Sequence, residues 1–196
     1  MLGRRLFLLV LAALPVAARA DAPPTREPFA KAHVTMMARF EGRDGEARLA
    51  EVDVWAEGTR LRAKLRGVEG AGSGELWVDG LSAEAVRVLD GKVVEPRKRT
   101  LEQGLKLAFS PVTTLANSNN DRIAGHSCKL VTERVASGLT LTRCIWRGLP
   151  LSVELSGRGF SFNAAATLVE EGAVALADLQ PPAGVPPAPA SLNAAR

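Results

Sequence analysis

Residues Glu51–Arg66 alternate between charged and apolar side chains, and this pattern restricts the possible fold more than any other. A period of two places successive side chains on opposite faces of a strand, so the segment predicts a β-hairpin that turns at Glu57-Gly58. One face of this hairpin is charged and the other apolar, so the apolar face needs a covering layer. The expected cross-strand pairs are Asp53 with Arg62, Glu51 with Lys64, Trp55 with Arg60, Val54 with Leu61, and Val52 with Ala63.

Further alternating segments follow along the chain, with glycine-bearing turns between several of them. Asp90-Gly91 is typical of a two-residue hairpin loop, and Gly157–Gly159 suits a three-residue loop. The pattern predicts a meander of antiparallel strands, most of them apolar on one side only. The additional strands expected are Ala32–Phe40, Glu75–Asp79, Ala85–Leu89, Lys92–Glu95, Ser127–Val135, Leu139–Trp146, Leu151–Ser156, Phe160–Val169 and a short piece near Val174.

One segment, Thr100–Phe109, has the pattern of a helix. A capping-box motif opens it, and its apolar side chains recur at 3.6-residue spacing. Gly104 weakens this prediction because glycine disfavours helix interiors, and Pro111 either ends the helix or begins a second short one. We expect the apolar stripe to cover the concave face of the sheet; a surface for a partner is the alternative.

The N-terminus predicts export from the cytoplasm. Two arginines are followed by an apolar run, Leu6–Leu14, that is too short to span a bilayer. Ala18-Arg19-Ala20 matches a signal peptidase site, so we expect cleavage after Ala20, and no cysteine follows that could be lipidated. The expected location is therefore periplasmic or secreted.

The expected organisation is a signal peptide at 1–20, an extended segment at 21–30, a β domain at 31–180 and a Pro/Ala-rich disordered tail at 181–196. Loss of Arg4, Arg5 and Arg19 with the signal peptide lowers the formal charge from +4 to about +1. A nearly neutral mature chain lacks the electrostatic basis for binding nucleic acid.

Two cysteines in an exported chain are expected to form a disulfide. A hairpin centred on Ala136 would set Leu130 opposite Thr142 and Cys128 directly opposite Cys144. A metal site that includes the nearby His126 is the alternative, but no further cluster of ligands completes it.

The residues that catalysis commonly requires are few. The chain has two histidines, His33 and His126, no tyrosine and no Gly-x-Ser-x-Gly motif. The glycine-rich stretch Gly67–Gly74 lacks the residues of a phosphate-binding loop, and Glu170-Glu171 resembles an exposed turn. We therefore expect no enzymatic activity, no cofactor and no resident metal.

Apolar side chains exceed what a half-solvated sheet requires, most clearly at alternate positions of Leu149–Leu155. A curved sheet lined in this way either forms an ordinary packed core or encloses a cavity for an acyl chain or another apolar ligand. The residues expected to line that cavity are Val52, Val54, Leu61, Leu65, Leu76, Val78, Leu105, Phe109, Leu151, Val153, Phe160 and Phe162.

The region around the two cysteines resembles a known family. Ile123–Cys128 has an x-G-x-x-C pattern and Cys144–Leu151 a C-x-W-x-G-x-P-L pattern, after a charged hairpin and a central helix. These features resemble the LolA/LppX-like superfamily of periplasmic lipoprotein carriers and related uncharacterised exported proteins, over roughly residues 32–183. The resemblance implies a half-open β-barrel, closed by one or two short helices, whose apolar interior takes lipid acyl chains. It also implies an arginine that helps to hold the closed state.

Two functions are therefore considered. The first is an exported, non-enzymatic protein that binds a lipid or another apolar ligand, lipoprotein acyl chains included, in the concave face of its sheet. The second is an envelope interaction or structural module with a solid core and no ligand, which contacts an envelope protein through a sheet edge or through the proline-rich tail.

Overall fold

The computed structural model describes residues 27–42, 45–68, 73–79, 82–89, 92–94, 101–110, 119–135, 138–157 and 159–180. The signal peptide and the Pro/Ala-rich tail expected at the two ends lie outside these residues, as does the second short helix expected after Pro111.

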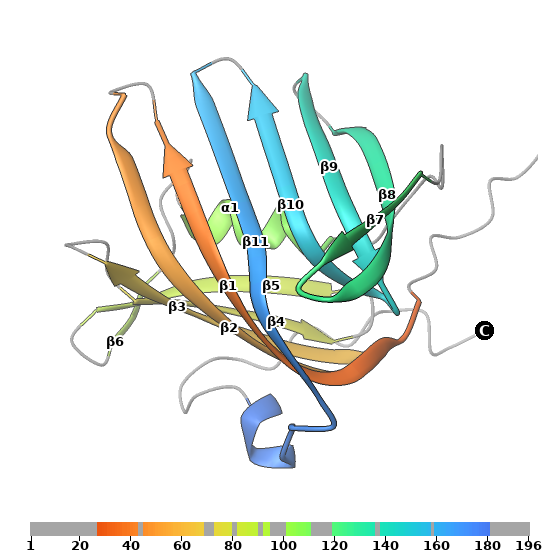
Figure 1. Cartoon of the computed structure of the whole chain (residues 1–196). Coiled ribbons are helices and arrows are strands. Elements are labelled where there is room, and N and C mark those ends of the chain that lie inside the picture. The colour runs from red at the N-terminus through yellow and green to blue at the C-terminus, as the bar shows by residue number, and fades with distance from the viewer. Residues whose placement is uncertain are drawn as a thin grey trace, which may run out of the picture.

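The described strands form one antiparallel sheet of 11 strands that curves strongly around a helix (Figure 1). Its order is β6-β5-β4-β3-β2-β1-β11-β10-β9-β8-β7, so β1 and β11 pair near the middle and β6 and β7 form the two edges. This is the mainly-β, half-open architecture expected from the sequence. The strands are β1 (Phe29–Glu41), β2 (Ala47–Gly58), β3 (Arg60–Val68), β4 (Ser73–Asp79), β5 (Ser82–Leu89), β6 (Lys92–Val94), β7 (Asn119–Ile123), β8 (His126–Val135), β9 (Leu139–Trp146), β10 (Leu149–Gly157) and β11 (Phe160–Glu171).

Helix α1 (Leu101–Ala108) lies within the curve of the sheet and packs against β4, β5 and β10 (Figure 1). The expected helix and its covering role are confirmed. A tertiary contact explains why residue 104 is a glycine: a Cβ atom there would approach Cδ2 of Phe162 to 2.7 Å. The glycine therefore lets α1 lie directly on β11, which offsets its poor helix propensity.

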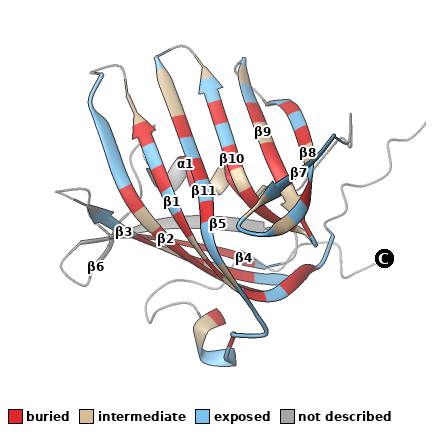
Figure 2. Cartoon of the chain, in the orientation of Figure 1, coloured by how far each residue is buried: buried red, intermediate tan, exposed pale blue. Residues whose placement is uncertain are grey.

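Side-chain burial alternates along the strands, as Figure 2 shows for the central strands. On β2, Val52 and Val54 are buried on the concave side, as are Leu61 and Leu65 on the neighbouring strand β3. These side chains, α1 and the concave faces of β10 and β11 form one continuous hydrophobic core. The period-two pattern thus predicted correctly which faces of β2 and β3 are buried.

The register of the β2–β3 hairpin differs from the expected one by two residues. Glu57 pairs with Arg60, so the loop is Gly58-Thr59 rather than Glu57-Gly58, and Gly58 has φ +62°, which glycine adopts without strain. The two faces keep their composition because an even shift preserves side-chain direction. The observed pairs are Asp53 with Lys64, Glu51 with Arg66, Trp55 with Arg62, Val54 with Ala63, and Val52 with Leu65.

The β8–β9 hairpin is displaced in the same way. Leu130 pairs with Cys144, not with Thr142, so Cys128 and Cys144 are offset across the strands rather than directly opposite. Val135 pairs with Leu139, and Gly138, which directly precedes Leu139, has φ +74°. The position of the left-handed glycine therefore sets the register, and a hairpin centred on Ala136 is wrong.

Two smaller elements also differ from expectation. β7 was not predicted because its sequence, Asn-Asn-Asp-Arg-Ile, has no apolar alternation, and most of it is exposed at a sheet edge. The strand expected near Val174 is wrong: the chain there leads into a short 3₁₀ helix, η1 (Leu176–Leu179), which packs against β2 and β3. Val174 and Leu179 are buried and anchor this segment to the sheet.

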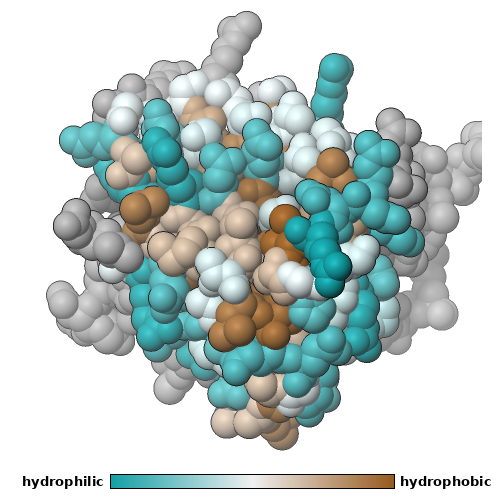
Figure 3. Space-filling model, in the orientation of Figure 1, coloured by the Kyte–Doolittle hydropathy of each residue, from teal (hydrophilic) through white to brown (hydrophobic). Residues whose placement is uncertain are grey.

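The convex face combines ion pairs with a small apolar area. His33 contacts Glu170 through Nδ1 at 2.9 Å and Asp53 through Nε2 at 3.2 Å, and its ring stacks on Trp55. Hydrophilic side chains surround the apolar area in the middle of the face (Figure 3). Exposed apolar side chains on this face include Met37, Leu49 and Leu168, on the adjoining strands β1, β2 and β11.

Candidate functional site

A cavity of about 570 Å³ opens beside the C-terminal end of α1, where the helix leaves the β8–β9 end of the sheet uncovered. Its size lies within the usual range for small-molecule sites. Its walls come from α1, β8, β9, the β9–β10 turn and the segment that enters β1. The lining residues are Glu27, Phe29, Ala108, Phe109, Ser110, Asn120, Ser127, Cys128, Lys129, Val131, Arg143, Ile145, Trp146, Arg147, Gly148 and Pro150.

Burial separates these residues into a floor and a rim. The floor is mostly apolar and buried, and includes Phe29, Phe109 and Val131. The rim is polar and exposed: Glu27, Asn120, Ser127, Lys129 and Arg147. A site of this form has an apolar interior with polar groups that orient whatever enters it.

Arg143 lies in the floor with only 1% of its surface exposed. Its Nη1 donates hydrogen bonds to the carbonyl oxygens of Ser110 at 2.6 Å and Ala108 at 3.3 Å. Those carbonyls lie at the C-terminal end of α1, where helix carbonyls lack intrahelical partners and the helix dipole favours a cation. Arg143 therefore fastens the end of α1 to β9.

The charge of Arg143 is balanced by Glu133 on β8, whose carboxylate accepts a hydrogen bond from Nη2. Burial lowers the pKa of Arg143, and the neighbouring Glu133 opposes that shift. Nε of Arg143 is buried without a hydrogen-bond partner among the described residues. The floor thus contains an internally neutralised ion pair with one unsatisfied donor.

The N-terminal segment closes one side of the cavity. The Ala30 N–H donates to the carbonyl of Arg147 at 2.9 Å, which holds the start of β1 over the β9–β10 turn. Arg147 and Gly148 both have positive φ, as a two-residue type I′ turn requires. A Cβ atom at Gly148 would approach the Pro28 carbonyl oxygen to 2.5 Å, so only glycine permits this crossing.

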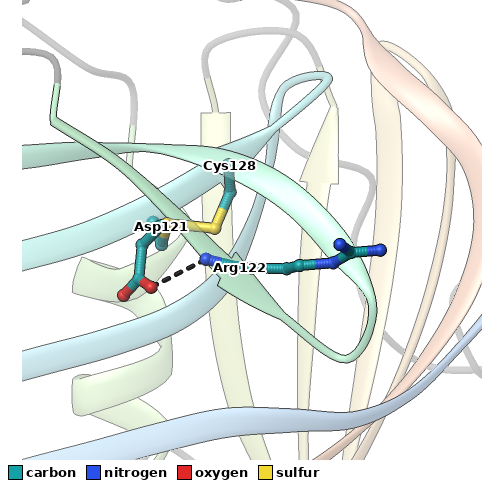
Figure 4. The surroundings of a disulfide bond; sticks show 4 residues. Asp121, Arg122 and Cys128 are labelled. Carbon is teal, nitrogen blue, oxygen red and sulfur yellow. Dashed lines mark hydrogen bonds between the residues drawn. A yellow bond between two sulfur atoms is a disulfide. The ribbon is translucent and has the colours of Figure 1, made fainter.

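A disulfide between Cys128 and Cys144 joins β8 to β9 behind β7 (Figure 4). The two Cα atoms are 5.3 Å apart, and Asp121 of β7 is the cross-strand neighbour of Cys128. The expected disulfide is confirmed. Within the described ranges, no group of three or more His, Cys, Asp or Glu residues could hold a metal ion.

Of the residues expected to line a ligand cavity, Phe109 lies in the lining of this one. The others pack in the hydrophobic core, where Phe160 is partly buried and the rest are buried. Their contact with a ligand stays a prediction.

Sequence reasoning missed the residues at the other end of the concave face, among them Lys129, Glu133 and Arg143. The sequence of β9 contained a signal that could have identified Arg143. Leu141, Arg143 and Ile145 alternate along β9, so an arginine occupies a position that the pattern assigns to the core. A charged residue there requires a buried partner or a functional reason.

Both histidines lie close to carboxylates. His33 lies between Glu170 and Asp53 on the convex face. His126 packs against Trp146 and approaches Glu171 to 3.9 Å.

No protein-family model matches the chain, and no curated protein matches it. Among solved structures, MucB matches with a TM-score of 0.42 and 18% identity, over 81% of this chain and 59% of MucB. This chain therefore spans less than two thirds of that structure. A putative outer membrane lipoprotein-sorting protein domain from Vibrio parahaemolyticus matches with a TM-score of 0.37 and 9% identity, over 76% of this chain and 88% of the domain.

The half-open curvature of the sheet and the helix on its concave face agree with the architecture that the resemblance of the sequence implied. At these identities and TM-scores, nothing follows about what this chain binds. The part of the chain that the structure describes contains no helix with the length and apolarity needed to cross a bilayer.

Proposed function

We propose that this chain is an exported, non-enzymatic binding protein that holds a lipid acyl chain or another apolar ligand in the cavity beside the end of α1. The observation that carries the proposal is the cavity of about 570 Å³ with a buried apolar floor. Entry into this cavity would remove the apolar surface of the ligand from water, which is favourable by about 25 cal/mol for each Å² buried.

The position of Arg143 supports a role for α1 as a movable cover. Hydrogen bonds from Arg143 hold the C-terminal end of the helix, and Gly104 lies directly against Phe162. A ligand that needs more room would displace the end of the helix and release those two carbonyls. Arg143 thus suits the helix-holding arginine that the family resemblance implies.

The alternative function is an envelope interaction module with a solid core. The cavity at the β8–β9 end disfavours it, because the core is not solid there. Under the proposal the partners are a lipid or a lipoprotein acyl chain, received in the periplasm or outside the cell. An envelope protein would deliver or accept that ligand.

The proposal is tested by filling the cavity. Ile145 lines the cavity on β9, and Thr140 on the same strand is exposed and lies outside the lining. Ile145→Phe should weaken uptake of a fatty acid or a monoacylglycerol, while Thr140→Phe should leave it unchanged. Uptake is measured by calorimetry and by native mass spectrometry of protein purified in the presence of membranes. Absence of ligand uptake by the unmodified chain would refute the proposal.

A further inference from the structure

The cavity rim contains two oppositely charged side chains that no other described residue neutralises. Lys129 on β8 and Glu27 at the entry to β1 are both exposed lining residues, and they come from different walls of the cavity. Among the described residues neither forms an ion pair, with the other or with a third group. Among the described lining residues, one unpaired cation and one unpaired anion are therefore exposed at a cavity with a mostly apolar floor.

The remaining charges of the cavity are already compensated. Arg147, also on the rim, pairs with Glu171 at 2.9 Å and lies over the ring of Trp146. Arg143 in the floor is neutralised by Glu133. A ligand head group would consequently meet Lys129 and Glu27 as the two unpaired charges.

We infer that the cavity selects an amphiphile whose head group is zwitterionic, with a phosphate that pairs with Lys129 and an ammonium that pairs with Glu27. The apolar floor would take the acyl chain of the same molecule. This inference rests on the proposed function, since it concerns the head group of the ligand held there. A single-chain phosphoethanolamine lipid is the simplest compound with this chemistry.

A purely anionic head group fits less well. It would gain from Lys129 but would be repelled by Glu27, so the two contributions would oppose each other. A neutral head group would leave both charges without a partner. A zwitterion of matching polarity gains from both, although each exposed pair contributes only modestly.

The inference is tested with three ligands that share one acyl chain: a lysophosphatidylethanolamine, an alkyl phosphate and a monoacylglycerol. Binding of each is measured by calorimetry for the unmodified chain, Lys129→Gln and Glu27→Gln. Each variant should weaken binding of the zwitterionic lipid by about two- to fivefold. For the alkyl phosphate the signs should differ: Lys129→Gln weakens binding and Glu27→Gln strengthens it.

Binding of the monoacylglycerol distinguishes a failure of the head-group inference from a failure of the proposed function. Its binding should be unaffected by either substitution, and Lys64→Gln and Glu154→Gln, outside the cavity lining, should change none of the three affinities. Equal binding of all three ligands, or a Glu27→Gln variant that binds the zwitterion more tightly, would overturn the head-group inference while leaving the proposed function intact. Failure of all three to bind would overturn both.

Discussion

The two ends of the concave face belong to one sheet, and strands at both ends have alternating side chains, but different groups occupy the concave side at each end. At the β2–β4 end, side chains such as Leu61, Leu65 and Leu76 are buried in the main core. At the β8–β9 end, α1 has ended and the inward positions include the charged residues Glu133 and Arg143, beside a cavity. Apolar alternation on its own therefore does not distinguish a packed core from a ligand site. The position at which the covering helix ends makes that distinction.

The convex and concave faces also differ in how their charged side chains are surrounded. On the convex face Asp53 accepts hydrogen bonds from several neighbours that remain partly in contact with water. On the concave face Arg143 and Glu133 are both buried and form an ion pair with each other. Substitutions of Arg143 or Glu133 should therefore lower the free energy of unfolding more than substitutions of Asp53 and its neighbours on the convex face.

The largest effect is expected at the buried ion pair. Glu133→Gln should lower the free energy of unfolding by about 3–5 kcal/mol, because Arg143 would be left as an uncompensated buried charge. Urea denaturation measures this. The double variant Glu133→Leu with Arg143→Met should recover most of the loss, since it removes both charges together. A double variant as unstable as the single one would show that the hydrogen bonds to the α1 carbonyls, rather than the charge, decide stability.

Removal of the disulfide ranks second. Cys128 and Cys144 are separated by 16 positions, and replacing both with alanine should cost about 3 kcal/mol on the chain-entropy model of a loop of this length. Thermal and urea unfolding of the double variant, compared with the oxidised chain, check the value. If the disulfide also braces the cavity wall, ligand affinity should fall in the same variant at temperatures where it is still folded.

At the packed end, Gly104→Ala tests how closely α1 rests on the sheet. Helix propensity alone would favour alanine by about 1 kcal/mol. The expected outcome is the reverse, a loss of about 1–3 kcal/mol, because the new methyl group would collide with the ring of Phe162. The same substitution in a Phe162→Leu background should be much less costly. A stabilised Gly104→Ala variant would show that the helix is not in close contact with β11.

The smallest effect is expected on the convex face. Asp53→Asn should cost about 1–2 kcal/mol, because it weakens charge-assisted hydrogen bonds from Arg66 and His33. Glu57→Gln, which removes an exposed pair with Lys31, should change the free energy of unfolding by less than about 1 kcal/mol. Urea denaturation of both variants checks this order. An Asp53→Asn loss as large as that of Glu133→Gln would contradict the proposed contrast between the two faces.

Most of the fold could be predicted because its rules are local. The strand Leu139–Trp146 was predicted with its observed bounds, and α1 was predicted from its capping motif and apolar spacing. Both hairpin registers were wrong by two residues, since the register depends on which residue of a short loop takes positive φ. The faces remained correct because an even shift does not turn a side chain over.

The candidate site was largely beyond prediction because it is formed by segments distant in sequence. Phe29, Phe109 and Ile145 meet only when the N-terminal segment, α1 and β9 are brought together. Arg143 could have been noticed as a charged residue at an inward position, but nothing local indicates that it pairs with Glu133 or reaches the end of α1.

The sequence by itself determined the alternation of faces, the need for a covering helix and the pairing of Cys128 with Cys144. These follow from side-chain polarity, from the period of a strand and from the presence of two cysteines in the sequence. Only the tertiary structure decided the hairpin registers, the approach of Gly104 to Phe162 and the position of the cavity. The physical reason is that close packing and buried charge are settled by how separate elements meet, and that information lies in no single segment.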